Sequence, residues 1–324
     1  MTAAGAGTAA AGVAALSGHR PELLVLRALK LGDLLVAVPA LKGLRRAFPE
    51  HRLLYAAQGW LAEALDLVGG YELLPTHGLD QPLAKEPGAV DVAVNLHGGG
   101  PESRARIDAL KAKRTIAHAG PKHEGPPWRD DLHERERWVR LLEWHGIAAD
   151  PADVGIARPQ EAGPAPGAAV LHVGAAYGSR LWPAGRFAEV ASVLAAAGHR
   201  VVFTGGSAEA ARAVEVCRLA GLPAEAVLAG RLGLAAFAAA VAEASVVVSA
   251  DTGAAHLASA YGTPSVVLFG PARPEIWGPP PGPHVVLTRP ELRRGDAFAA
   301  DPDPALLGVQ VSDVLAALRG LSVL

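Results

Sequence analysis

The feature that most constrains the fold is a regular alternation of short apolar runs with amphipathic stretches along most of the chain. Residues 23–26 form the first run, and a loop with glycine and then a helical pattern at 34–48 follow it. A short apolar run predicts a buried strand, and strands that alternate with helices predict βαβ units and parallel sheets. We therefore predict an α/β fold.

The alternation occupies two halves of the chain. In the first half we expect strands at 53–57, 72–74, 91–96 and 115–117, helices at 60–68 and 103–112, and a loop at 119–131. Residues 133–145 alternate in charge sign, which favours a half-exposed helix with solvated charges. In the second half we expect strands at 169–173, 200–204, 226–229, 245–249, 265–269 and 284–287, and helices at 183–197, 207–220, 234–244, 252–261 and 304–318.

Residues 159–167 (PQEAGPAPG) separate the halves and read as a linker. We predict a disordered tail at 1–20, an N-terminal Rossmann-like domain at 21–160 and a C-terminal one at 161–324, whose last helix could pack back on the N-terminal domain. Ligands of such sheets bind at the carboxyl ends of the strands, so the cleft between the domains is the expected active site.

Charge and composition narrow the functional classes. The chain carries 30 basic and 32 acidic residues, and this balance does not favour a nucleic-acid partner. We find no signal peptide and no membrane-spanning run, and a single cysteine, Cys217, suits a reducing compartment. We expect a buried bystander role for Cys217 and a cytoplasmic protein, with peripheral contact at the inner face of the membrane left open.

The strongest motif is Asp251-Thr252-Gly253, where a β-branched strand runs directly into a helix of small residues. The first turn of a helix has unpaired N–H groups and a partial positive charge, so it can bind a phosphate. Gly253 permits close approach, Thr252 can donate its hydroxyl, and His256 lies one turn further along. The alternative is that Asp251 or Thr252 only caps the helix.

Three further loops follow predicted strands. Asp33 comes after the first strand and could deprotonate a hydroxyl acceptor or cap a helix, with even support. Arg180 could pair with a diphosphate or lie on the surface. Gly205 suggests close approach of a ligand, and Glu209 could bind ribose hydroxyls or complement the dipole of its helix. His97 and the glycines after it could line an acceptor pocket or form a plain turn.

We expect neither a metal nor a cofactor. The 12 histidines are scattered, and no His, Asp and Glu set has the spacing of metal ligands. There is no Gly-x-Gly-x-x-Gly fingerprint after the first strand and no Walker A sequence, so a nicotinamide dinucleotide loses its main support.

Four segments together resemble the ADP-heptose:lipopolysaccharide heptosyltransferases, glycosyltransferase family 9. They are RALKLGDLLVAVPALKGLRRAFP, HVGAAYGSRLWPAGRFAEV, VVFTGGSAEAA and SADTGAAHLASAYGTPSVVLFGP, in the order and at the spacings of the family. The resemblance implies a GT-B fold, in which two Rossmann-like αβα domains face each other across a cleft. It also implies an inverting, metal-independent transfer of a sugar, a heptose in this family, from an ADP-sugar donor to a hydroxyl of a glycan, glycolipid or small molecule.

The resemblance also assigns roles. Asp33 matches the proposed catalytic base, Arg180 replaces a lysine that contacts the donor, and Glu209 matches a residue thought to hold the donor ribose. Thr252, Gly253 and His256 match contacts to the donor diphosphate. Leu29 and Lys30 stand where family members with a lipid A–core acceptor often have serines, and the region 97–131 matches poorly, so the acceptor is open. A sugar-nucleotide 2-epimerase-like enzyme and a non-catalytic nucleotide-sugar-binding protein are the alternatives.

Overall fold

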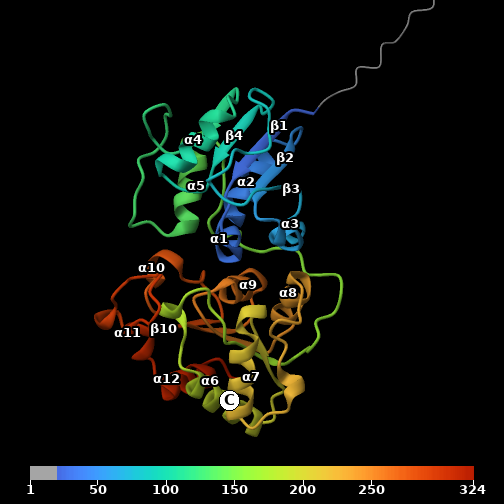
Figure 1. Cartoon of the computed structure of the whole chain (residues 1–324), viewed down its shortest axis with the longest axis vertical. Helices are drawn as coiled ribbons and strands as arrows, with labels where there is room; N and C mark the ends of the chain where they lie inside the picture. Colours follow the sequence, from blue (N-terminus) through green and yellow to red (C-terminus); the bar gives the residue numbers. More distant parts are fainter. Residues whose placement is uncertain (1–19) are drawn as a thin grey trace, which may run out of the picture.

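The computed structural model describes residues 20–324, and the predicted tail lies outside this range except for Arg20. Two α/β layers are stacked along the long axis of the molecule, the first half of the chain above the second (Figure 1). Each contains a five-stranded parallel sheet. The predicted α/β fold with two Rossmann-like domains is confirmed.

The N-terminal sheet has the strand order β3-β2-β1-β4-β5. Its strands are β1 (Glu22–Leu26), β2 (Arg52–Ala57), β3 (Glu72–Pro75), β4 (Val92–Asn95) and β5 (Arg114–Ile116). Its helices are α1 (Leu31–Val36), α2 (Val38–Ala47), α3 (Ala62–Val68), α4 (Pro101–Ala109) and α5 (Glu134–Trp144), with a 3-10 turn η1 (Gly59–Leu61). All five residues of β1 are buried, as expected for a central parallel strand with helices on both faces.

The C-terminal sheet has the order β10-β9-β8-β6-β7. Its strands are β6 (Ala169–His172), β7 (Val201–Thr204), β8 (Val246–Ala250), β9 (Ser265–Leu268) and β10 (His284–Leu287). Its helices are α6 (Ala184–Ala196), α7 (Ala210–Leu219), α8 (Leu234–Ala242), α9 (Gly253–Tyr261), α10 (Pro274–Trp277), α11 (Pro304–Leu307) and α12 (Val311–Gly320). Short 3-10 turns are η2 (Gly178–Arg180), η3 (Ser207–Glu209), η4 (Ala224–Ala226) and η5 (Pro290–Leu292).

Three predicted elements have different limits in the structure. The helix expected at 34–48 is two helices, because Pro39 stands at the start of α2, where a ring without an N–H disrupts a continuous helix. The helix expected at 304–318 is likewise divided into α11 and α12. The strand expected at 226–229 is wrong. Ala226 and Val227 donate to Pro223 and Ala224 as in a turn, and only Val227 bridges to β7, at Phe203.

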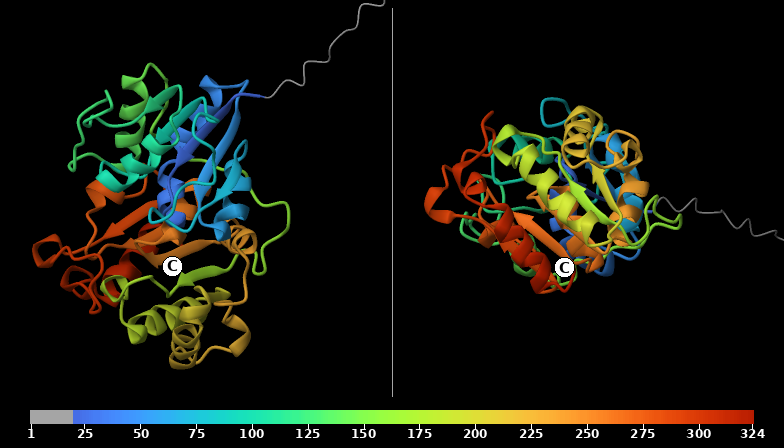
Figure 2. Two further views of the ribbon diagram at one scale, coloured as in Figure 1. Left: turned by 45° about the horizontal axis from the view of Figure 1, so that its top comes forward. Right: turned by 90° about the horizontal axis from the view of Figure 1, so that it is seen from below.

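Two predictions about packing also change. Helix α12 packs on α6, β9 and β10 of its own domain rather than on the N-terminal domain. It lies in the lower part of the molecule in Figure 1, and Figure 2 shows the same red segment from two further sides. In α5 the solvated-charge interpretation is wrong for Glu134 and Arg137, which are both buried. Cys217 is buried in α7, as predicted.

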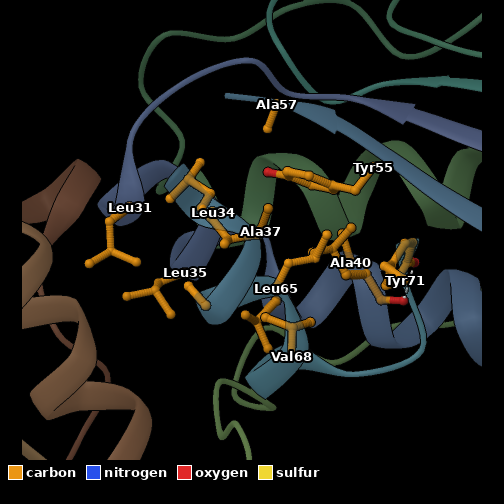
Figure 3. Packing of buried hydrophobic residues seen from close by; sticks show 14 of the residues in the cluster. Leu31, Leu34, Leu35, Ala37, Ala40, Tyr55, Ala57, Leu65, Val68 and Tyr71 are labelled. Carbon is orange, nitrogen blue, oxygen red and sulfur yellow. Dashed lines mark hydrogen bonds between the residues drawn. The ribbon is translucent and has the colours of Figure 1, made fainter. Parts of the chain in front are cut away.

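The chain crosses between the domains near residue 160. The N–H of Ala157 donates to Leu67 in the N-terminal domain, whereas the N–H of Gly163 donates to Glu243 in the C-terminal domain. The largest apolar cluster contains residues of both domains. Leu31 and Leu35 point from α1 toward the C-terminal domain (Figure 3), and α1 packs directly on α9. The carboxyl ends of the two central strands therefore meet at a shared apolar contact.

Candidate donor and active site

The start of α9 lies at the contact between the domains and has free hydrogen-bonding capacity. Thr252 is the N-cap residue, but its side chain makes no capping hydrogen bond, and its buried Oγ1 has no partner among the described residues. The N–H groups of Gly253 and Ala254 are likewise without a backbone acceptor within residues 20–324. This helix start can therefore bind an anion, and capping does not explain the Thr252 hydroxyl.

Asp251 is buried behind this helix start and lies between two candidate donor contacts. Its Oδ2 is 3.8 Å from Nη1 of Arg180, and its Oδ1 is 3.6 Å from Nε2 of His256. The Nη1 of Arg180 also donates to the carbonyl of Asp251 at 3.4 Å, whereas its Nε is buried without a partner. Asp251 itself is negative, so the geometry suits it to orienting Arg180 and His256 rather than to touching a phosphate.

The loop that carries Arg180 is braced from neighbouring segments. Arg212 of α7 donates to the carbonyl of Val173 at 2.8 Å and to that of Trp182. Ser179 donates its hydroxyl to Ala297 at 2.8 Å. The sequence interpretation missed Arg212, because an arginine inside an amphipathic helix carries no signal for a loop that it contacts only in the folded state.

Glu209 and Gly205 lie after β7, one strand away from the Arg180 loop. Oε2 of Glu209 accepts from the N–H of Gly206 at 2.5 Å, so this carboxylate does complement a helix start. A Cβ at Gly174 would lie 2.6 Å from Cγ of Glu209, and one at Gly205 would lie 3.0 Å from its Cβ. These glycines make room for Glu209, and its second oxygen is left for a ligand.

Asp33 lies in the N-terminal domain, in α1, which packs on α9. It is the third residue of α1, and its Oδ2 accepts from the N–H of Lys30 at 3.1 Å. Its side chain is 25% exposed, and Oδ1 lies 3.6 Å from Nη2 of Arg27, which is buried. Asp33 thus closes the first turn of its helix with one oxygen and presents the other to Arg27.

The two sides of the site are in direct contact. A Cβ at Gly32 would lie 2.9 Å from Cδ2 of His256, and one at Gly253 would lie 2.8 Å from Cδ2 of Leu31. Nζ of Lys30 lies 5.0 Å from the ring centre of Tyr177 of the C-terminal domain. Asp33 and the α9 residues, which sequence separates widely, therefore belong to one site.

His97 follows β4 in the N-terminal domain, and its place in an acceptor pocket stays a prediction. Its Nδ1 accepts from the N–H of Ala28 at 3.2 Å. Burial, together with repulsion from Arg27, lowers the pKa of His97 to about 4, so the ring is neutral near pH 7 and carries its proton on Nε2. Two cavities of about 510 and 420 Å³ lie elsewhere, beside β5 and near the amino ends of β1 and β2, and they contain none of these residues.

Two negative findings concern the described part of the chain. Within residues 20–324, no group of three or more His, Cys, Asp or Glu side chains could hold a metal ion. No helix in the same range has the length and apolar character that crossing a membrane requires.

Sequence comparison connects this geometry with known proteins. Residues 145–294 match the profile of glycosyltransferase family 9 (heptosyltransferase). Lipopolysaccharide heptosyltransferase 1 of Pseudomonas aeruginosa PAO1 is 39% identical over 181 residues, which are 54% of this chain and 50% of that protein. The aligned part of this chain thus spans about half the length of the curated relative.

Comparison with solved structures extends the likeness to nearly the whole chain. A glycosyltransferase family 9 structure from Veillonella parvula has a TM-score of 0.73 at 20% identity and covers 93% of this chain and 97% of its own. The Escherichia coli heptosyltransferase WaaC with ADP has a TM-score of 0.69 at 19% identity, with 93% and 99% covered. TibC, described as an iron-containing heptosyltransferase, has a TM-score of 0.61 at 15% identity, with 94% and 76% covered.

At these identities the structural matches establish the fold alone, and they confirm GT-B. The family resemblance predicted from the motifs is confirmed by the profile match and by the curated relative. The residue roles in the site remain predictions. Residues 145–294 of this chain are thus similar to glycosyltransferase family 9, the heptosyltransferases.

Proposed function

We propose that this chain is an inverting glycosyltransferase that moves a sugar, a heptose by analogy with its family, from an ADP-sugar to a hydroxyl of a glycan, glycolipid or small molecule. One observation carries the proposal. The start of α9 has a buried Thr252 hydroxyl with no partner among the described residues, next to Asp251 and its contacts Arg180 and His256, and Asp33 lies in α1, which packs on α9 from the other domain. A diphosphate leaving group and a base on opposite sides of the sugar need this arrangement.

The reaction is a direct displacement at the anomeric carbon. Asp33 accepts the proton of the acceptor hydroxyl while the acceptor oxygen bonds to that carbon. The bond from the same carbon to the diphosphate oxygen breaks, and ADP departs toward α9. Attack from the face opposite the leaving group inverts the anomeric configuration. Arg180, the α9 N–H groups and Thr252 stabilise the negative charge that develops on the diphosphate.

Metal independence is part of the proposal, because a guanidinium and a helix start supply positive charge where ADP departs. The test is transfer activity in the presence of EDTA. Unchanged activity supports the proposal, whereas activity that disappears in EDTA and returns with a divalent metal or iron contradicts it.

The experiment that tests the donor class is a thermal-shift series with ADP, UDP and GDP, each at several concentrations. A ligand that binds only the folded state raises the melting temperature, and at a given concentration a ligand with a lower Kd raises it more. We expect stabilisation by ADP and little by UDP or GDP. A larger shift with UDP would contradict an ADP-sugar donor.

The experiment that tests transfer incubates ADP-heptose with a panel of glycan, glycolipid and small-molecule hydroxyl acceptors and identifies the products by mass spectrometry. We expect ADP and a glycosylated acceptor of inverted configuration. Turnover of a nucleotide sugar without any acceptor would favour an epimerase. Tight ADP binding without turnover across the panel would favour a binding protein.

The proposal includes a cytoplasmic location with peripheral contact at the inner membrane face. Cell fractionation with salt washes tests both parts. We expect the protein in the cytoplasmic fraction, with any membrane-bound part released by salt, because peripheral electrostatic contact is screened by ions. Recovery outside the cytoplasmic membrane would contradict the location.

A further inference from the structure

A group of charged side chains is buried in the N-terminal domain, directly behind Asp33. Arg27 is 1% exposed, Arg137 4% and Glu134 5%. Arg27 follows β1, whereas Glu134 and Arg137 lie one turn apart at the start of α5. Charges buried to this extent need partners, since burial without compensation costs several kcal/mol per charge.

Arg27 connects α5 to α1, the helix that carries Asp33. Its Nε donates to the carbonyl of Asp33 at 2.6 Å, and its Nη1 donates to the carbonyl of Leu96. Its Nη2 lies 3.6 Å from Oδ1 of Asp33 and 3.5 Å from Oε2 of Glu134. The guanidinium also lies over the Trp138 ring, 4.8 Å from its centre. Arg27 is therefore shared between two carboxylates, of which the Asp33 side chain is the more exposed, at 25% against 6% for that of Glu134.

Glu134 is held in place independently of Asp33. Its Oε2 accepts from Nε1 of Trp138 at 2.9 Å, and its Oε1 pairs with Nη1 of Arg137. Arg137 in turn donates to the carbonyl of Arg129 at 2.9 Å. These contacts fix the Glu134 carboxylate rigidly, so its charge acts on Arg27 from a constant position.

Other ionisable groups around Asp33 come from several elements. Burial raises the pKa of Tyr55 on β2 and lowers that of His97 after β4 to about 4, so both are neutral near pH 7. Lys30 directs its ammonium group to Tyr177, and His256 contacts Gly32 from α9, with His133 electrostatically coupled to His256. Arg27, Glu134 and Arg137 are the buried fixed charges behind Asp33.

We propose that Glu134 is a positioning residue for the transfer reaction, which acts by holding Arg27 so that Asp33 has a fixed place and a balanced electrostatic field. The inference rests on the proposed role of Asp33 as the base. Arg27 without Glu134 would pair fully with Asp33. A base held in a tight ion pair is oriented away from the acceptor and accepts a proton less readily.

The test compares Glu134→Gln with Glu136→Gln, an exposed glutamate on the same helix. Glutamine keeps the shape and can still accept from Trp138. We expect Glu134→Gln to lower kcat by at least about tenfold, as small misplacements of reacting groups do. We expect KM for the ADP-sugar to stay unchanged and the acidic limb of the kcat/KM profile to move to lower pH. Glu136→Gln should match the wild type.

Two more variants fix the sign of the effect. Arg27→Met removes the cation beside Asp33, so the acidic limb should move to higher pH, opposite to Glu134→Gln. Glu134→Asp keeps the charge on a shorter side chain and should restore most of the wild-type profile. Melting temperatures of all variants, measured in parallel, separate loss of folded protein from loss of rate.

The inference is overturned if Glu134→Gln has the kcat and pH profile of Glu136→Gln. It is also overturned if kcat falls with the melting temperature while the limb stays in place, because the network then serves only the fold. Asp33→Asn separates a failure of the proposed base from a failure of the proposed role of Glu134. Full transfer by Asp33→Asn removes the proposed base itself, whereas an inactive Asp33→Asn beside a normal Glu134→Gln removes only the role of Glu134.

Discussion

At the residue scale, the site is built from side chains whose hydrogen bonds are incomplete within the protein. Thr252 Oγ1 and Nε of Arg180 are buried without partners among residues 20–324. Buried polar atoms are nearly always paired, and an unpaired one costs about 1–3 kcal/mol. The proposed diphosphate would supply partners for both atoms.

Thr252→Val tests this interpretation with a side chain of the same shape. Loss of one hydrogen bond to a charged phosphate should weaken ADP binding by about 1.5–3 kcal/mol, measured by titration calorimetry. Ser259→Ala is the matched control on the same helix, because the Ser259 hydroxyl bonds within α9, to the carbonyl of Ala255 at 3.0 Å. Equal affinity of Thr252→Val and the wild type would place the diphosphate elsewhere.

At the scale of elements, the packing of α1 on α9 joins the helix of Asp33, the proposed base, to the helix proposed to bind the donor. Gly32 and Gly253 stand where the two helices touch, and each would place a Cβ within 3.0 Å of a side chain from the other domain. Neither has the positive φ that requires glycine. Their small size, rather than their flexibility, permits the contact.

Gly32→Ala should therefore weaken donor binding, although Gly32 lies in the acceptor-side domain. The added methyl group would press on His256, and overpacking of this kind costs about 1–3 kcal/mol. We expect a lower melting temperature and a lower affinity for ADP. Gly59→Ala is the control, since nothing lies within 4 Å of its Cβ position. An unchanged ADP affinity in Gly32→Ala would show that the two helices separate freely.

At the scale of the whole molecule, several polar contacts hold the domains together. Oε2 of Glu63 in α3 accepts from the N–H of Ala235 at the start of α8, at 2.5 Å. His133 and Arg135 both bond to the carbonyl of Gly278, at 3.0 and 2.9 Å. The donor half and the acceptor half are thus fixed relative to each other at both sides of the α1–α9 contact.

Glu63→Ala should loosen one of these contacts. A carboxylate at a helix start is worth about 0.5–2 kcal/mol, so we expect a modest fall in melting temperature and faster proteolysis at the crossing near residue 160. Asp66→Ala, an exposed acid on the same helix, is the control. Identical proteolysis of the two variants would mean that the Glu63 contact contributes nothing to the domain arrangement.

The pH dependence of stability is a property of the whole fold. Burial lowers the pKa of His97, His118, His133 and His172 to about 4 each, whereas an unfolded histidine titrates near 6.5. Between these values the unfolded chain binds more protons than the folded chain. The free energy of unfolding should therefore fall as the pH drops from about 6.5 to about 4. Urea unfolding at pH 7 and pH 5 measures this, and equal stabilities would contradict it.

Much of the fold followed from local pattern. Short apolar runs such as Val246–Ala250 predict buried strands, and their alternation with helices predicts parallel sheets. The helix start at Thr252 and the acid at Asp33 were also visible, because strand ends and helix starts can be read from neighbouring residues. The prediction of a strand at 226–229 was wrong, because a short run of Ala, Val and Leu fits a turn equally well.

The sequence by itself determined the two-sheet architecture, the family resemblance and the helix start at α9 where we propose the anion site. Only the tertiary structure decided that Gly32 touches His256, that Arg212 braces the Arg180 loop, and that Glu134 and Arg137 are buried behind Asp33. The physical reason is the separation in sequence of the residues that interact. Periodicity and capping depend on residues within a turn or two of each other, whereas burial of a charge depends on a partner from a distant segment. The alternating charges of α5 therefore indicate a solvated helix from the sequence, and only the fold places Arg27 beside Glu134.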